Sequence, residues 1–208
     1  FEQLALGTPH RLEGENAKSA LQLLETVTDI FDQCGIKYCL TAGTLLGIVR
    51  EERLLPWDTD LDLRIFRPDV KKLPRAMWKI RFAGYLARIR RQEFIDPPLK
   101  KGEKRIVKIF QKAGFLKKGK VTMDCFIATR QDNDYFWSCG GSKLYTKKAV
   151  PAHFYDETKV ITFRNKDYTA PKDVEDYLTF RYGDWRTPVK EWDYTKDDRA
   201  IISSELKN

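Results

Sequence analysis

The chain has 208 residues, of which 42% are apolar and 33% are charged, and its formal net charge is +8 at pH 7. This composition is typical of a soluble globular protein, and it excludes collagen-like, low-complexity and disordered chains. The length predicts a single domain over residues 1–208 with its own hydrophobic core. Taken alone, the positive charge favours a protein that binds nucleic acid or an anionic surface.

The chain has no sequence signal for membrane insertion or secretion. No apolar run approaches the roughly 18 residues that a transmembrane helix needs. The start at Phe1 does not resemble a signal peptide, because no basic region is followed by an apolar stretch. No Cys-x-x-Cys pair is formed by the four cysteines, Cys34, Cys39, Cys125 and Cys139. We therefore expect buried, reduced thiols and a cytoplasmic protein, which could also work at the inner face of the membrane.

The first predicted elements are a helix, a strand and a second helix. Apolar residues recur at helical spacing over 15–34, which predicts an amphipathic helix. Residues 37–42 predict a short strand, which Gly43 interrupts. A short helix is then expected over 44–50, with Thr44 as its N-cap.

Strands dominate the rest of the chain. Alternating polar and apolar residues predict a strand over 58–66, and a second one is predicted over 121–128. Further elements are expected at 135–139 (strand), 160–169 (strands) and 173–181 (helix). Strands interleaved with helices indicate an α+β fold in which helices flank a mixed sheet.

Positive charge is concentrated in one segment. Residues 64–120 hold 19 Lys or Arg and 4 Asp or Glu, a balance of +15. Because the stretch 67–120 is also the least periodic part of the chain, we expect it to be a basic insertion into the fold.

The strand predicted over 58–66 carries acidic side chains on one face. Because side chains alternate along a strand, Asp58, Asp60 and Asp62 share a face with Arg64. Carboxylates so close together repel each other, so this arrangement favours a cation among them. Hard oxygen ligands select Mg²⁺ or Mn²⁺. The alternative is a solvated acidic edge without a metal.

Two other features strengthen the metal interpretation. Asp124 lies in the middle of the apolar run 121–128, where a carboxylate is costly unless it is paired, hydrogen-bonded or metal-bound. The turn at Gly43 and Thr44 opens a helix, whose backbone N–H groups can bind phosphate oxygens. A phosphate-binding turn, an acidic strand and one later carboxylate are typical of two-metal phosphoryl or nucleotidyl transfer.

These motifs resemble a known family. Gly43-Thr44-Leu45-Leu46-Gly47, followed by Pro56-Trp57-Asp58-Thr59-Asp60-Leu61-Asp62, is similar to the signature of the LicD/fukutin family of the nucleotidyltransferase superfamily. Near the C-terminus, the chain also resembles the family's closing motif at Tyr177-Leu178, Arg181-Tyr182-Gly183-Asp184-Trp185 and Pro188. The resemblance covers roughly residues 15–66, 121–128 and 145–190.

The resemblance implies a nucleotidyltransferase-like fold and a transferase dependent on Mg²⁺ or Mn²⁺. Such enzymes move a phospho-alcohol group from a CDP-linked donor to a glycan hydroxyl and release CMP. Phosphocholine from CDP-choline is the favoured group. The alternatives are ribitol or glycerol phosphate from CDP-ribitol or CDP-glycerol, and a nucleotidyltransferase that attaches the nucleotide itself. The implied acceptor is a cell-surface glycan such as lipopolysaccharide, capsule or teichoic acid, which could be lipid-linked.

The resemblance also implies roles for the acidic residues. Asp60 and Asp62 match the paired metal ligands and catalytic carboxylates, and Asp58 extends this metal-binding set. Asp124 matches the third carboxylate, which would bind the metal or accept the acceptor's proton as a general base.

Donor binding is expected from five residues. Gly43 and Thr44 match the turn that faces the donor's phosphates. Arg50 and Arg64 could neutralise the pyrophosphate, or either could pair with an aspartate. Trp57 offers an aromatic face to a quaternary ammonium group, with packing in the core as the alternative.

The basic segment is then better suited to a partner of an enzyme than to nucleic acid. We expect it to face an acidic glycan, a lipid-linked acceptor or the donor's pyrophosphate, and it could contact a membrane surface. A binder of nucleic acid or anionic lipid without catalytic activity is disfavoured, because it would leave the acidic motif unexplained.

Overall fold

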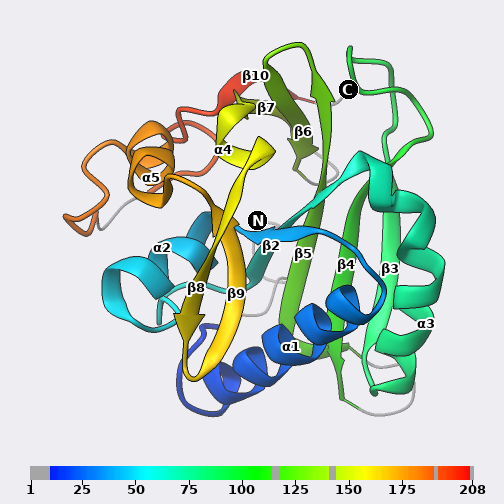
Figure 1. Cartoon of the computed structure of the whole chain (residues 1–208), viewed down its shortest axis with the longest axis vertical. Coiled ribbons are helices and arrows are strands. Elements are labelled where there is room, and N and C mark those ends of the chain that lie inside the picture. Colours follow the sequence, from blue (N-terminus) through cyan, green and yellow to red (C-terminus); the bar gives the residue numbers. More distant parts are fainter. Residues whose placement is uncertain (1–9, 114–117, 141–143, 190–191, 207–208) are drawn as a thin grey trace, which may run out of the picture.

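The computed structural model describes residues 10–113, 118–140, 144–189 and 192–206. Figure 1 shows a curved sheet with helices packed against it. The helical elements are α1 (Gly14–Gln33), α2 (Ala42–Glu51), the 3₁₀ helix η1 (Arg67–Lys72), α3 (Leu73–Phe82), α4 (His153–Asp156) and α5 (Val174–Tyr182). The strands are β1 (Tyr38–Leu40), β2 (Leu61–Phe66), β3 (Leu86–Arg91), β4 (Lys104–Lys112), β5 (Lys118–Gln131), β6 (Asp134–Cys139), β7 (Leu144–Pro151), β8 (Thr158–Phe163), β9 (Lys166–Pro171) and β10 (Ile201–Leu206).

Within the residues that the structure describes, the central sheet is mixed and has eight strands. The parallel pair β2–β5 lies at its centre, flanked by β1 beside β2 and by β4 and then β3 on the other side of β5. The long strand β5 continues into a hairpin with β6, which leads to β7 and β10. A separate hairpin is formed by β8 and β9. This architecture confirms the predicted α+β fold with a mixed sheet flanked by helices.

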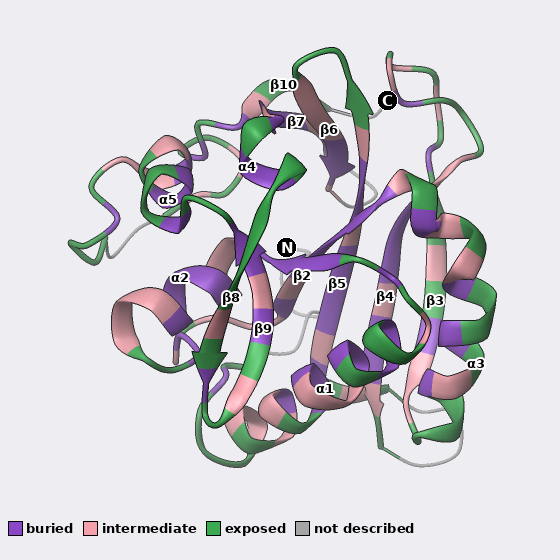
Figure 2. Ribbon diagram, viewed as in Figure 1, coloured by how far each residue is buried: buried purple, intermediate pink, exposed green. Residues whose placement is uncertain are grey.

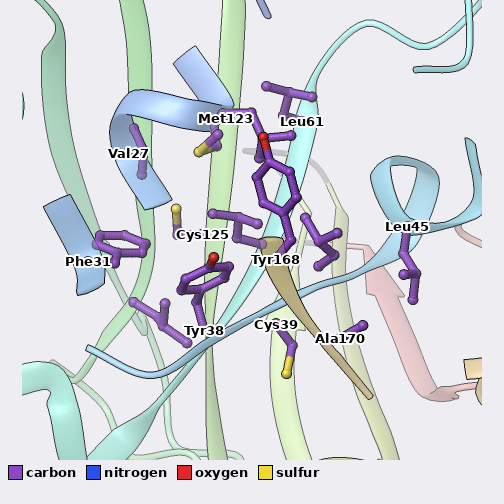
Figure 3. Packing of buried hydrophobic residues seen from close by; sticks show 14 of the residues in the cluster. Val27, Phe31, Tyr38, Cys39, Leu45, Leu61, Met123, Cys125, Tyr168 and Ala170 are labelled. Carbon is purple, nitrogen blue, oxygen red and sulfur yellow. The ribbon is translucent and has the colours of Figure 1, made fainter. Parts of the chain in front are cut away.

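One face of the central sheet is apolar and is covered by α1 and α3. Figure 1 shows both helices lying across the β3–β4–β5 region, and Figure 2 shows how much of the chain there is buried. Met123 and Cys125 of β5 are fully buried, as are Val27 and Phe31 of α1, and Figure 3 shows these side chains gathered in one cluster. Because side chains alternate along a strand, the other face carries the intervening polar residues of β2, β4 and β5.

Most predicted elements are present, with shifted ends. The helix predicted over 15–34 is α1, and the short helix is α2, which begins two residues earlier than predicted, at Ala42. Thr44 is therefore not the N-cap, which is Thr41, because the helix already includes Gly43. The strand predicted from residue 58 begins only at Leu61, so Asp58 and Asp60 lie in the preceding loop.

The basic segment 67–120 is built into the same sheet as the acidic residues. It contains α3, β3, β4 and the start of β5, and β4 pairs directly with β5. The weak periodicity of this segment hid two strands and a helix that were not predicted. That the chain forms one domain stays a prediction. None of the described helices is both long and apolar enough to cross a lipid bilayer.

Candidate functional site

The start of α2 fits tightly against the loop that precedes β2. A Cβ atom added to Gly43 would lie 2.0 Å from Oδ2 of Asp58, so a glycine is needed to leave room for this carboxylate. Asp58 also accepts a hydrogen bond at Oδ1 from the backbone N–H of Thr59 (2.9 Å). A helix N-terminus carries partial positive charge, which favours a carboxylate beside it. Asp58 therefore holds the space next to Gly43, where the sequence predicted a donor phosphate.

Thr44 connects this helix to the acidic strand. It lies in the first turn of α2 and is 2% exposed, and its Oγ1 accepts a hydrogen bond from the backbone N–H of Asp62 (2.8 Å). The contact fixes the position of α2 relative to the first residues of β2. The hydroxyl of Thr44 is buried in this contact, and its predicted role in donor binding stays a prediction.

The carboxylates predicted to form the site come together on the polar face of the sheet. Asp62 of β2 and Asp124 of β5 are paired directly in the parallel register, and Asp60 immediately precedes β2. Burial, followed by the charges of Asp58 and Asp124, raises the pKa of Asp60 to about 7. Burial and then the neighbouring aspartates raise the pKa of Asp62 well above its ordinary value, although the charge of Arg181 opposes this. These carboxylates therefore favour a cation or a proton among them.

Lys108 of β4 supplies one positive charge that the sequence analysis missed. Its Nζ lies 2.6 Å from Oδ2 of Asp124, its partner in the antiparallel β4–β5 register. The signal was available in the sequence, since Lys108 interrupts the apolar run from Ile106 to Phe110 just as Asp124 interrupts its own. A charged residue in the middle of each of two apolar strands is most stable when the two meet.

The other carboxylate oxygen of Asp124, Oδ1, lacks a partner among the described residues of the site. Oδ1 is buried and has no hydrogen-bond partner within the described part of the chain. The same described residues contain no group of three or more His, Cys, Asp or Glu that could hold a metal ion by themselves. Mg²⁺ commonly binds through one or two carboxylates and completes its coordination with water and substrate phosphates. The oxygen-rich donor set thus suits Mg²⁺ in the presence of a phosphate-bearing substrate.

Arg50 and Trp57 lie close together, at the end of α2 and in the loop that precedes β2. The guanidinium of Arg50 is 5.9 Å from the ring centroid of Trp57, which is 48% exposed. Arg50 also pairs with Glu51 (2.8 Å) and donates a hydrogen bond to the backbone carbonyl of Trp185 (3.1 Å). Among the described residues, Arg50 thus pairs with a glutamate and not with one of the site aspartates, and its role in donor binding stays a prediction. The exposed ring of Trp57 remains accessible to a ligand.

Arg64 lies two residues after Asp62 on β2, as the alternation predicted, but its side chain is buried. It is 1% exposed, and its guanidinium carbon lies 3.7 Å from the ring centroid of Trp137 on β6. None of the ion pairs among the described residues joins it to an aspartate. Nε and Nη1 of Arg64 are buried and have no hydrogen-bond partner within the described part of the chain, and a role for Arg64 in donor binding stays a prediction.

A buried polar network supports the site from α5. The hydroxyl of Tyr177 lies 2.8 Å from Oγ1 of Thr41 and accepts a hydrogen bond from Nη1 of Arg181 (2.8 Å). Arg181 also donates from Nε to Asp198 (2.7 Å), which pairs with Lys148 (2.8 Å). The network links the N-terminus of α2 to the closing motif, and it places a buried cation near Asp62. From the sequence, Tyr177 and Arg181 could be recognised only as part of the closing motif.

The cysteines are free thiols, as predicted. Cys39, Cys125 and Cys139 are buried, and Cys34 is partly exposed. Burial raises the pKa of Cys39 to about 12, so its thiol stays protonated at neutral pH.

Comparison with known proteins decides the family. The model of the LicD/FKTN/FKRP nucleotidyltransferase domain matches residues 35–173, which include the start of α2, the acidic strand and Asp124. The chain belongs to this family. The matched range also includes the whole of the basic segment 67–120, for which no resemblance was found from motifs alone.

Some curated relatives match most of this chain, and another matches a short part of it. The uncharacterized protein RP689 of Rickettsia prowazekii is 25% identical over 181 residues, covering 85% of this chain and 58% of that protein. The ribitol-5-phosphate transferase FKTN of Homo sapiens is 28% identical over 181 residues, covering 86% of this chain and 36% of that protein. The ribitol 5-phosphate transferase FKRP of Homo sapiens matches 44 residues at 41% identity, which is 21% of this chain and 9% of that protein. The chain therefore spans only part of the length of these relatives.

Two solved structures of the same antibiotic-resistance factor are distantly similar. The crystal structure of ANT(2'')-Ia in complex with adenylyl-2''-tobramycin has a TM-score of 0.44 and 12% identity, covering 84% of this chain and 82% of that chain. The solution structure of ANT(2'')-Ia has a TM-score of 0.43 and 15% identity, covering 88% of this chain and 81% of that chain.

Proposed function

We propose that this protein transfers a phospho-alcohol group from a CDP-linked donor to a hydroxyl of a cell-surface glycan. The observation that carries the proposal is the direct pairing of Asp62 with Asp124, beside the loop that carries Asp58 and Asp60. The family match supports an enzyme of this class, and the relatives FKTN and FKRP bear the name ribitol phosphate transferase. We therefore place ribitol phosphate first among the transferred groups.

The chemistry requires an in-line displacement at phosphorus. The acceptor hydroxyl attacks the phosphorus that carries the alcohol. The bond from that phosphorus to the bridging oxygen then breaks, and CMP leaves with the negative charge on that oxygen. Asp60 and Asp62 would hold Mg²⁺ or Mn²⁺, with Asp58 at the edge of the set. When bound, the ion would supply positive charge to the pyrophosphate. Asp124 can ligate this ion or accept the hydroxyl's proton at Oδ1, which has no partner among the described residues.

The protein's own residues would position these reactants. Thr44 holds the backbone of Asp62, and Gly43 makes room for Asp58. Lys108 offers a further positive charge beside Asp124. No covalent enzyme intermediate is required, because positioning and preorganised charge supply most of the catalysis in phosphoryl transfer.

Phosphocholine is the second candidate for the transferred group. The exposed ring of Trp57 is the observation in its favour, because aromatic faces attract quaternary ammonium groups. The guanidinium of Arg50 already lies 5.9 Å from that ring, however, and its charge would repel a second cation on the same side. This repulsion supports a neutral polyol ahead of choline.

A donor panel tests the proposal. The protein is incubated with CDP-ribitol, CDP-glycerol or CDP-choline, with Mg²⁺ and with glycan acceptors, and free CMP and labelled product are measured. We expect CMP release with CDP-ribitol that exceeds release with CDP-choline, and that disappears in Asp62→Asn but persists in the surface control Asp156→Asn. Nucleotide found in the product would support a nucleotidyltransferase instead. Equal turnover by Asp62→Asn and wild type would overturn the proposed site.

A further inference from the structure

A second charged feature lies on the same sheet face as the carboxylates. In the strand register, Arg88 of β3 is paired with Lys108 of β4. Lys108 is paired with Asp124 of β5, which is paired in turn with Asp62 of β2. Side chains paired in register point to the same face of a sheet. One row across neighbouring strands therefore runs from two cations to two carboxylates.

Two more cations widen the positive end of this row. Arg90 lies two residues after Arg88 on β3 and so shares its face. The Nζ of Lys118 lies 4.2 Å from the ring centroid of Phe110 on β4. Loss of hydration, followed by the charges of Arg88, Arg90 and Lys108, lowers the pKa of Lys118. We call Arg88, Arg90, Lys108 and Lys118 the basic face.

The basic face is open, whereas the carboxylates are recessed. Arg88, Arg90 and Lys118 are exposed, and the side chain of Lys108 is 26% exposed, compared with 9% for Asp124. No ion pair between Arg88 or Lys118 and an acidic side chain occurs among the residues that the structure describes. Cations that repel one another without acidic partners favour an anionic ligand.

Protection of a sheet edge does not account for the whole basic face. Cations on an exposed edge strand discourage pairing with other chains, and β3 is such a strand because it pairs only with β4. Lys108 and Lys118, however, belong to the inner strands β4 and β5. The opposite face of the same strands is apolar, since Ala87 and Val107 are buried. The residues of the basic face therefore lie on the face that carries the candidate active site.

We propose that the basic face binds a phosphate monoester on the acceptor sugar, while a hydroxyl of that sugar reaches Asp124. This subsite rests on the proposed transferase function. Neighbouring strands are about 4.8 Å apart, so the backbones of Arg88 and Asp124, two strands apart, are separated by about 10 Å. That distance accommodates a monosaccharide with its phosphate. Arginine recognises phosphate through paired hydrogen bonds, and Lys108 joins the basic face to Asp124.

Titration of the full chain with small sugars tests the subsite. Binding of glucose 6-phosphate, glucuronate and glucose is followed by amide chemical shifts. We expect glucose 6-phosphate to bind more tightly than glucuronate, and glucose to bind weakest, because a phosphate monoester carries more charge than a carboxylate. The double variant Arg88→Ala/Lys118→Ala should weaken binding of glucose 6-phosphate by about tenfold or more. Lys71→Ala/Arg75→Ala removes the same charge from η1 and α3, and it should leave binding unchanged.

Donor binding separates this subsite from the proposed function. CDP-ribitol with Mg²⁺ is titrated into the same variants, and its affinity should not change with Arg88→Ala/Lys118→Ala. If wild type binds glucose 6-phosphate through the basic face but binds no CDP-alcohol, the proposed function fails and the anion subsite stands. If wild type does not distinguish glucose 6-phosphate from glucose, or if the double variant binds it as wild type does, the subsite is overturned.

Discussion

The two faces of the central sheet differ in what they contribute, and Asp62 and Leu63 show the difference within two adjacent residues. Leu63 is 0% exposed in the apolar core, whereas Asp62 lies on the opposite face, paired with Asp124. Burial of apolar surface on the first face stabilises the fold. On the second face, burial and mutual repulsion raise the pKa of Asp60 and Asp62, which opposes folding with all carboxylates charged. If the proposed function holds, stability and function depend on opposite faces of one strand.

The largest effect on activity is expected from Asp62→Asn. The change keeps the size of the side chain and removes one repelling charge, so the free energy of unfolding should be unchanged or higher. Turnover should fall by at least about a hundredfold, because a preorganised charge at the reacting centre is lost. Activity and thermal unfolding are measured on the same sample, with Asp156→Asn as the surface control. A variant with full activity, or one that is unfolded, would break the proposed division between the faces.

The neighbouring substitution Leu63→Ala should act in the opposite way. Truncation of this fully buried side chain leaves a cavity, and we expect a loss of about 2–5 kcal/mol in the free energy of unfolding. Turnover per folded molecule should stay close to that of wild type at low temperature. Urea unfolding combined with active-site titration measures both quantities. A stable variant with low turnover would contradict the assignment of Leu63 to the core face.

Gly43→Ala tests the fit between α2 and Asp58. The added methyl group would lie 2.0 Å from Oδ2 of Asp58, so the carboxylate must move. We expect turnover to fall by about tenfold or more, because small displacements of positioned groups slow reactions strongly. A double-mutant cycle with Asp58→Ala measures the clash directly. Gly43→Ala should cost little further activity once Asp58 is truncated, and strictly additive losses would exclude this contact as the cause.

The pH dependence of stability tests the same carboxylates in the absence of substrate. In metal-free protein the pKa of Asp60 is raised to about 7, compared with an ordinary value near 3.9 in an unfolded chain. The stability that comes from protonated Asp60 is complete below about pH 4 and is lost as pH rises through about 7. Urea unfolding in EDTA should therefore show a steeper decline over this range for wild type than for Asp60→Asn. Identical curves for the two proteins would contradict this electrostatic account.

Local alternation predicted the face of Asp62 on β2, whereas Asp58 and Asp60 lie in the loop before the strand. For Asp124 the sequence predicted only that a carboxylate within an apolar run needs a partner, and in the structure it pairs with Lys108. The length and position of α1 were also predicted from local periodicity, since its apolar residues recur at helical spacing. Where a single strand or helix has its own periodic pattern, one sequence is sufficient to predict which side chains face the core.

Contacts between distant segments could not be predicted in this way. The need for glycine at position 43 comes from Asp58, and the burial of Arg64 comes from Trp137, which lies on another strand. Lys108 is a partial exception, because a lysine within an apolar run indicates that a buried acid lies nearby. The strands of the basic segment were missed because their polar residues are arginine and lysine at uneven spacing, with a register shift after Arg90.

Calorimetric titration of CDP-ribitol, with and without Mg²⁺, tests the central claim most directly. The claim is that the recessed carboxylates on the charged face bind a divalent cation together with the donor's phosphates. We predict strong binding only when Mg²⁺ is present, with that dependence lost in Asp62→Asn and retained in Asp156→Asn. Binding of equal strength in EDTA, or an unchanged Mg²⁺ dependence in Asp62→Asn, would contradict the account.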